Sequence, residues 1–179
     1  MTVSYLGLDL SFAKTGWSVI EVKDGVPSIK AAGLIVSDTK KDATQRIDDT
    51  VTEIKYIASK TNPAALVKEA SIIRQVSSAT PVIKTHAVFE HELSGLYTLD
   101  DVSNSTVKAW ARTVTGSDGK RKDKEMVAEA VELYYGKIPQ IWTAKGRLLD
   151  DVADAIALMT LWLEREGVIQ TKFKRKKAK

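Results

Sequence analysis

Three strand-like segments follow one another at the start of the chain before any helical pattern appears. Residues 3–10 and 16–22 are rich in aliphatic, aromatic and β-branched types, and a short polar turn separates them. A third segment, 29–36, follows a turn that contains Gly25. Consecutive strands joined by short turns pair antiparallel. The chain is therefore predicted to begin with an antiparallel sheet, which excludes an all-parallel doubly wound fold.

The remainder of the chain alternates between helix and strand patterns. Apolar residues recur at three- and four-residue spacing in long segments, and two short apolar segments lie between them. The predicted helices span 42–60, 74–96, 104–113, 121–135 and 147–166, and the predicted strands span 64–68 and 97–102. The prediction is an α/β fold whose central five-stranded mixed sheet has three antiparallel strands, then parallel strands, with flanking helices.

Length and composition indicate one globular domain. The chain has 179 residues, which suits one hydrophobic core better than two, and its hydrophobic content of 44% argues against disorder. No apolar run approaches the roughly 18 residues that a membrane span needs, and the N-terminus lacks a secretory pattern. We therefore expect no membrane partner and a location in the cytoplasm.

Basic residues concentrate at the C-terminus. Residues 171–179 hold six of the 27 basic residues and no acid, which leaves 21 basic against 23 acidic residues in the rest. We therefore divide the chain into a domain of residues 1–170 and a basic tail of residues 171–179. Such a tail suits electrostatic binding of nucleic acid, and a solubilising terminus is an equally good explanation.

Two acidic residues end apolar strand segments. Asp9 closes the most hydrophobic of these segments, and Glu69 directly follows the segment 64–68. Taken singly, Asp9 is explained more simply as a turn cap, and Glu69 as a solvated loop residue. Two acids at the carboxyl ends of two strands, where open α/β sheets present their ligand groups, are better explained as parts of one site.

The last predicted helix carries two further acids on its apolar face. Asp151 and Asp154 share the side of the helix that also holds Leu158. The helix dipole is enough to explain Asp150 and explains Asp151 in part, but it does not reach Asp154. An acid aimed at the sheet beside another acid is repelled unless one of them is protonated or a cation is shared. This pattern favours a bound divalent ion.

The available ligand types point to a hard cation. The chain has no cysteine and two histidines, so thiolate zinc sites and cysteine nucleophiles are excluded. Four carboxylates, Asp9, Glu69, Asp151 and Asp154, match the oxygen ligands that Mg²⁺ or Mn²⁺ prefers. Two such ions can activate water and stabilise the leaving oxygen at a phosphodiester. The predicted reaction is metal-dependent phosphodiester hydrolysis.

Three segments together resemble the RuvC family of Holliday-junction resolvases in the RNase H-like superfamily. They are residues 7–20, the strand that ends in Glu69, and residues 151–157, and their order spans nearly the whole chain. The resemblance implies an RNase H-like fold in which the four acids bind metal and catalyse cleavage. It also implies that Lys124 supports catalysis beside the site. The implied substrate is branched DNA, including four-way junctions, cut by a homodimer in recombination, repair or phage DNA processing.

The sequence departs from the family pattern at two places. Leu10 and Ser11 follow the first aspartate where the family usually has proline and glycine, and Ile72 replaces an aromatic residue. The second departure favours a broader branched-DNA specificity than strict four-way junctions. The helix 74–96 is the candidate dimer interface, although its apolar residues fit the monomer core equally well.

Several basic residues are candidates for DNA binding because the resemblance places their segments near the acidic face. Taken singly, each is typical of a solvated surface charge. The candidates are Lys14, Arg74, Lys108, Lys120, Arg121, Lys122 and Lys124. Phosphate contacts from such residues would make binding strongly dependent on salt.

Two other functions fit parts of the sequence. An actin-like ATPase or sugar kinase also opens with a strand, an aspartate and a turn that faces phosphate, but such enzymes need two related domains around the nucleotide. A non-catalytic protein that binds branched DNA would keep the fold and the tail. Four acids beside DNA would then repel phosphate without any compensating metal.

Overall fold

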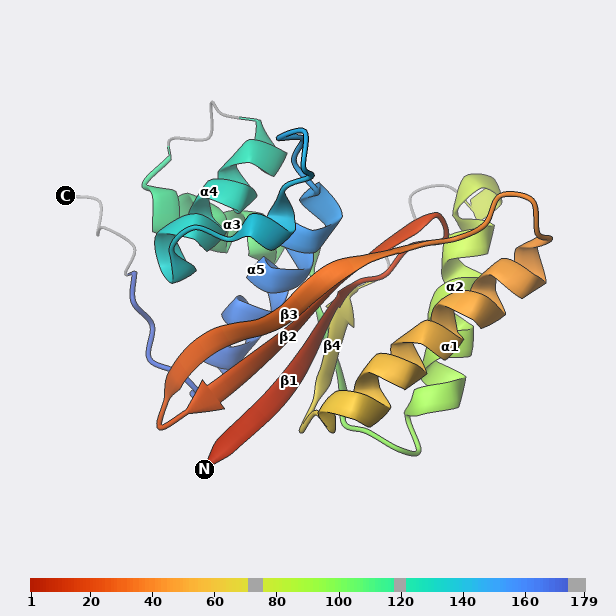
Figure 1. Ribbon diagram of the computed structural model, residues 1–179, viewed down its shortest axis with the longest axis horizontal. Helices are drawn as coiled ribbons and strands as arrows, with labels where there is room; N and C mark the ends of the chain where they lie inside the picture. The colour runs from red at the N-terminus through yellow and green to blue at the C-terminus, as the bar shows by residue number, and fades with distance from the viewer. Residues whose placement is uncertain (71–75, 118–121, 174–179) are drawn as a thin grey trace.

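A five-stranded mixed sheet forms the centre of the molecule (Figure 1). The computed structural model describes residues 1–70, 76–117 and 122–173. The strands are β1 (Thr2–Asp9), β2 (Lys14–Lys23), β3 (Val26–Val36), β4 (Leu66–Glu69) and β5 (Leu99–Val102), arranged in the order β3-β2-β1-β4-β5. Strands β1 to β3 pair antiparallel, β4 pairs parallel with β1, and β5 pairs parallel with β4. The predicted fold class is confirmed.

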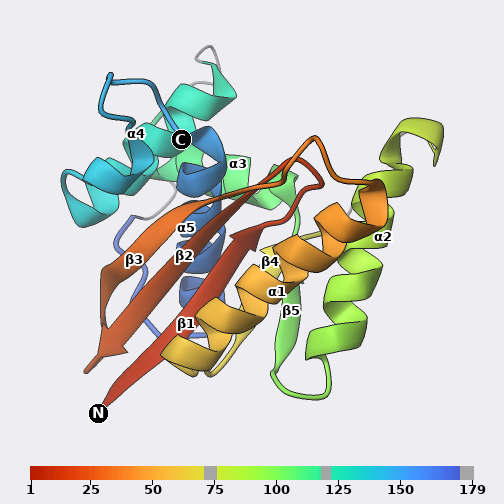
Figure 2. The same cartoon turned by 45° about the vertical axis from the view of Figure 1, so that its right-hand side comes forward.

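Helices cover both faces of this sheet. They are α1 (Ala43–Thr61), α2 (Val76–Leu93), α3 (Asn104–Thr115), α4 (Asp123–Tyr135) and α5 (Asp150–Arg165), with a short 3₁₀ helix η1 (Pro139–Ile141). Helices α1 and α2 lie on one face, and α3, α4 and α5 lie on the other (Figures 1 and 2). A separate hydrophobic cluster fills each side of the sheet.

Helix α5 packs unusually closely on strands β1 and β2. A Cβ atom added at Gly16 would lie 1.9 Å from the backbone oxygen of Asp151, and one added at Gly7 would lie 2.6 Å from that of Ala155. The Ser18 hydroxyl also donates a hydrogen bond of 2.9 Å to the Ala155 carbonyl. The missing side chains let the helix backbone approach the strands, which brings the first turns of α5 to the end of β1.

The turn between β1 and β2 is closed by its own side chains. The Ser11 hydroxyl donates to the Lys14 carbonyl at 2.7 Å and accepts from the Lys14 amide at 3.2 Å. The Thr15 hydroxyl donates to the Ser11 carbonyl at 3.0 Å. Serine at this position therefore holds the turn by hydrogen bonds, as short polar side chains commonly do.

Several helix boundaries differ from the predicted ones, by one to three residues. Helix α2 ends at Leu93, three residues early, and the predicted start at residue 74 lies outside the described residues. Helix α4 begins at Asp123 because Lys122 has extended backbone geometry as its N-cap. Helix α5 begins at Asp150 because residues 142–149 form a loop closed by a β-bridge. Within the described ranges, no helix is long and apolar enough to cross a membrane.

Candidate active site

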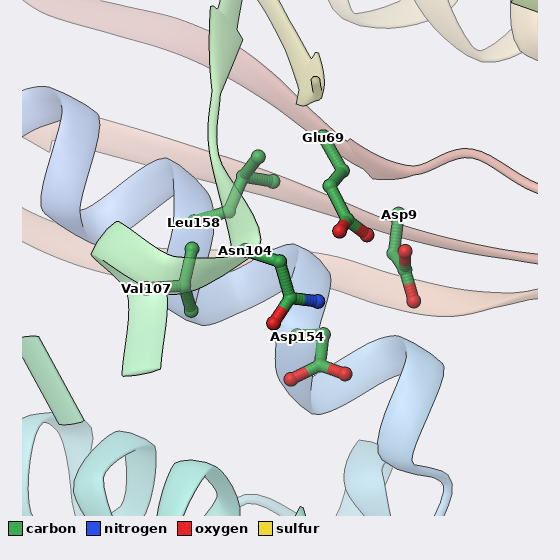
Figure 3. A pocket seen from close by; sticks show the side chains of 6 residues that line it. All are labelled: Asp9, Glu69, Asn104, Val107, Asp154 and Leu158. Atoms are coloured by element: carbon green, nitrogen blue, oxygen red, sulfur yellow. The ribbon is translucent and has the colours of Figure 1, made fainter. Parts of the chain in front are cut away.

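Three of the four predicted acids line one pocket. It forms where the ends of β1 and β4 meet α5 and the start of α3, and its lining residues are Asp9, Glu69, Asn104, Val107, Asp154 and Leu158. In Figure 3 the carboxyl groups of Asp9, Glu69 and Asp154 turn toward a common space, with the Asn104 amide beside them. The fold thus gathers side chains that are far apart in the sequence.

Strand periodicity explains why Asp9 faces α5. Side chains alternate between the two faces of a strand. Leu6 and Leu8 belong to the cluster under α1, whereas Gly7 touches α5, so Asp9 shares the face of Gly7. The side chain at the end of β1 that faces the second turn of α5 is thus the carboxylate of Asp9.

The parallel pairing of β1 with β4 brings Glu69 to the same place. Leu8 is in register with Lys68, so each strand ends one residue later at the same edge of the sheet. Val67 packs in the cluster under α5, and Glu69 follows two residues later on that face. The two carboxyl groups are close enough to share a hydrogen bond.

Burial and mutual repulsion make these acids difficult to ionise. Burial raises the pKa of Asp9 to about 9, and the hydrogen bond to Glu69 and the charge of Asp154 act in the same direction. Burial likewise raises the pKa of Asp154 to about 7, followed by the charges of Glu69, Asp150 and Asp151. Without a cation, the pocket therefore retains protons near neutral pH.

Asp151 lies beside the pocket and is absent from its lining. Burial is the main cause of its raised pKa, the Asp150 charge adds to it, and Lys124 and Lys14 lower it. Its charge in turn raises the pKa of both Asp9 and Asp154. Asp151 therefore acts on the pocket through its field, one helical turn before Asp154.

The chemistry of the lining suits a hard divalent cation, but the side chains are not arranged around one. The pocket offers carboxylate oxygens and the Asn104 amide oxygen, and no sulfur or imidazole group. Over the described parts of the chain, no three acidic or histidine side chains are positioned to hold a metal ion as they stand. Because burial and neighbouring acids raise the pKa of Asp9, binding of a cation would displace a proton from this carboxyl group.

Lys124 lies at the entrance to this acidic region, at the start of α4. Its amino group forms an ion pair with Asp150, and its side chain is 71% exposed. The Asp150 hydrogen bond and charge raise the pKa of Lys124, so it remains a cation. Its charge also lowers the pKa of Asp154, which shows electrostatic contact with the pocket. As described, Lys124 points at Asp150 and does not line the pocket.

The other predicted DNA-binding residues fall into three groups. Lys14 is exposed at the start of β2 and acts on Asp151 through its charge. Lys108 is held by Asp123 at 3.0 Å, and the exposed Lys122 lies 3.9 Å from Glu125. The remaining candidates, Arg74, Lys120 and Arg121, lie outside the described residues, as does Ile72.

Sequence reasoning missed two residues near the site. Asn104 begins α3 behind the Ser103 N-cap, and the capping pattern reveals the helix start without showing that it faces the acids. His86 is buried in α2, and its Nε2 atom lies 3.3 Å from the Leu10 carbonyl oxygen. Burial lowers the pKa of His86, which keeps the ring neutral beside the end of β1. No periodic or spacing signal singles out His86.

Comparisons with known proteins identify relatives over nearly the whole chain. The chain is 26% identical over 166 residues to the crossover junction endodeoxyribonuclease RuvC of Brachyspira hyodysenteriae, covering 91% of this chain and 95% of the relative. It is 25% identical over 164 residues to RuvC of Prochlorococcus marinus, covering 90% and 97%. No protein-family model matches the chain.

Solved structures share the same fold. Thermus thermophilus RuvC in complex with Holliday junction substrate superposes with a TM-score of 0.66 at 18% identity, covering 94% of this chain and 98% of that one. The yeast mitochondrial Holliday junction resolvase superposes with a TM-score of 0.67 at 16% identity, covering 93% and 80%. The predicted RNase H-like fold is therefore confirmed.

Proposed function

We propose that this chain, a RuvC-like protein in sequence and fold, is a metal-dependent endonuclease that cleaves Holliday junctions and other branched DNA. One observation carries the proposal: Asp9, Glu69 and Asp154 converge in a single buried pocket from separate parts of the fold. Burying acids that repel one another lowers the stability of the fold, so such a cluster points to a functional site. A bound hard cation would compensate for the repulsion, because carboxylate oxygens are the ligands that such cations prefer.

The metal-binding set is proposed to be Asp9, Glu69, Asp151 and Asp154. They would hold Mg²⁺, with Mn²⁺ able to substitute, and two ions per site. When bound, such ions activate water and stabilise the leaving oxygen of a phosphodiester. Asp9 and Asp154, whose pKa values are raised by burial, would release their protons when the ions bind, and the four carboxylates would hold the ions where the phosphate enters.

Basic side chains around the site are proposed to hold the DNA backbone. Lys14 and Lys124 are exposed and act on the site acids through their charges, and Lys122 is exposed just before α4. An incoming phosphate can compete with Asp150 for the Lys124 amino group. Lys108 would contribute after release from Asp123. The sequence-based candidates Arg74, Lys120 and Arg121 and the tail 171–179 complete the proposed DNA-binding set.

We also propose that the chain forms a homodimer. A homodimer would bring two such pockets to the opposing strands of one junction, and helix α2 is the candidate interface. Among the α2 side chains that the structure describes, at residues 80–93, the apolar side chains of Phe89 and Leu93 are fully buried and the other apolar ones are at least partly exposed. We propose that the enzyme acts in the cytoplasm of a bacterium or of a phage-infected host.

Cleavage of labelled DNA tests the proposal directly. A four-way junction, a flap and a linear duplex are incubated with the protein in Mg²⁺, Mn²⁺ or EDTA. We expect cation-dependent nicking of the branched substrates, with 3′-hydroxyl and 5′-phosphate ends. Asp9→Asn and Asp154→Asn should each reduce cleavage at least about a hundredfold, because each removes a metal ligand. Asp48→Asn is the matched control, since Asp48 is exposed on α1 across the sheet.

The outcomes separate this function from the alternatives. Cutting that persists in EDTA, or in the variant lacking both Asp9 and Asp154, would contradict the metal mechanism. Tight junction binding with no cleavage under any cation would favour a non-catalytic branched-DNA protein. Nucleotide binding without DNA cleavage would favour an actin-like ATPase or sugar kinase.

A further inference from the structure

The pairing of β1 with β4 stops just short of the site acids. Its last pair is Leu8 with Lys68, so Asp9 and Glu69 lie one residue beyond it. Each acid is paired on its other side, Asp9 with β2 and Glu69 with β5, but not with the other acid. Carboxylates that share a metal ion must be held within about 0.5 Å of the productive geometry. Contacts outside the β1–β4 pairing must therefore help to fix the spacing of these two strand ends.

Helix α2 contacts both strand ends from the face of the sheet opposite α5 (Figure 2). The His86 Nε2 atom lies 3.3 Å from the carbonyl oxygen of Leu10, the residue that follows β1. The Glu90 carboxylate lies 3.0 Å from the amino group of Lys68, the residue that precedes Glu69. Residues four apart lie on the same face of a helix. One face of α2 therefore reaches the chain neighbours of both acids.

The surroundings of His86 indicate that its contact with Leu10 is specific. A carbonyl oxygen only accepts hydrogen bonds, so Nε2 carries the proton and donates it. Burial lowers the pKa of His86, so the ring is neutral, and Nδ1 is a buried acceptor without a partner among the described residues. Burying an unpaired nitrogen costs stability, which an aliphatic side chain of similar size would avoid. What histidine adds here is the hydrogen bond to the end of β1.

A buried lysine makes the second contact. Lys68 follows Leu66 on the α2 face of β4, where an apolar side chain would pack, and its own side chain is only 3% exposed. Asp101 of the paired strand β5 lies 2.6 Å from the Lys68 amino group, and Glu90 adds a second carboxylate from α2. Replacing buried ion pairs by apolar residues often leaves stability unchanged or raises it. This ion pair is therefore better explained by the position that it fixes than by stability.

We propose that His86 and Glu90 are positioning residues that hold the ends of β1 and β4 at the spacing that a shared divalent ion needs. This inference rests on the proposed function, because it concerns the same metal-binding acids. Neither residue lines the pocket, and each acts through the residue next to an acid. A shift of the backbone beside either acid moves its carboxylate on the other face of the sheet, because successive side chains point to opposite faces.

Binding of Mn²⁺ to the folded protein without DNA tests this positioning role. Electron paramagnetic resonance measures the free Mn²⁺, and urea unfolding in EDTA reports the stability of each variant separately. His86→Leu removes the hydrogen-bond donor and should weaken Mn²⁺ binding about tenfold, the lower end of the effect typical of groups that orient metal ligands. His86→Gln keeps an N–H donor and should bind Mn²⁺ within about threefold of the wild type.

Glu90→Gln tests the second contact. It should weaken Mn²⁺ binding about fivefold, because Lys68 loses the charge that draws it toward α2 and solvent screens part of the effect. Glu92→Gln is the matched control. Glu92 lies on the same helix, is similarly exposed and forms an ion pair of 2.7 Å, but its partner is Lys55 of α1. Glu92→Gln should therefore bind Mn²⁺ like the wild type.

Unchanged Mn²⁺ affinity in either His86→Leu or Glu90→Gln would overturn the positioning proposal. Equal losses in His86→Leu and His86→Gln, or in Glu90→Gln and Glu92→Gln, would also overturn it. Lower stability in EDTA with unaltered Mn²⁺ affinity would mean that the contacts serve folding alone, which is a further contradiction. If His86→Leu does not fold, the comparison of Glu90→Gln with Glu92→Gln decides the matter. Wild-type protein that binds no Mn²⁺ would overturn the proposed metal site itself, whereas the other failures leave that site standing.

Discussion

The pocket acids should make the metal-free protein less stable as the pH rises. The pKa of Asp9 is raised by burial to about 9 in the folded chain, against an ordinary aspartate value of about 3.9 when unfolded. Between these two values the folded protein holds a proton that the unfolded chain has released. The stability that this proton confers is complete below the unfolded pKa and is lost as the pH rises through about 9.

The size of the effect follows from one proton. Each proton retained on folding lowers the free energy of unfolding by about 1.4 kcal/mol per pH unit. Between about pH 6.5 and about pH 8.5, the titration of Asp9 alone should therefore lower the free energy of unfolding by roughly 2–3 kcal/mol. Asp154, with a pKa of about 7, adds a contribution of the same sign in the lower part of this window. His86 acts in the opposite direction, because its pKa is lowered by burial, so its effect is confined to pH values below about 6.5.

Urea unfolding in EDTA at several pH values measures this slope. Mg²⁺ should restore stability, and it should do so more strongly at high pH because protons then compete less for the carboxylates. Asp9→Asn removes the retained proton, so it should flatten the slope and reduce the stabilisation by Mg²⁺. Asp48→Asn should behave like the wild type. Equal slopes in the wild type and Asp9→Asn, or a stability that does not change with pH, would refute the reasoning.

Three further expectations concern packing, a buried charge and the tail. Gly16→Ala should destabilise the fold by roughly 3 kcal/mol, since its Cβ would collide with backbone of α5, whereas Gly95→Ala, which has open space around it, should change the denaturation midpoint little. Asp101→Asn should lower the free energy of unfolding by about 1.5–3 kcal/mol, because the buried Lys68 amino group loses the charge of the carboxylate that lies 2.6 Å away. An unchanged denaturation midpoint would contradict this. Removal of residues 171–179 should weaken DNA binding more at low salt than at high salt, as measured by titration at two ionic strengths, and equal affinity at low salt would leave the tail with a solubilising role.

Local patterns were sufficient to predict the elements that carry the acids. The alternation in β1 and the three- and four-residue spacing in α5 are set by strand and helix geometry, so they can be recognised in a short segment. Asp9 and Glu69 end their strands as predicted, and Asp154 faces the sheet from α5. The helix boundaries were less accurate, because caps and loops depend on only one or two residues.

The sequence by itself determined which side chains could form an acidic site, because the face on which a residue lies follows from periodicity along a single element. Only the tertiary structure decided what surrounds that site. The approach of α5 to Gly16, the position of Asn104 at the pocket and the choice of Asp150 as partner for Lys124 all depend on how separate elements pack. The hydrogen bond from Trp142 to Glu132 also belongs to this group, since the loop before α5 must meet α4 to form it. Such contacts depend on the distances and angles between elements, and local sequence periodicity contains no information about either.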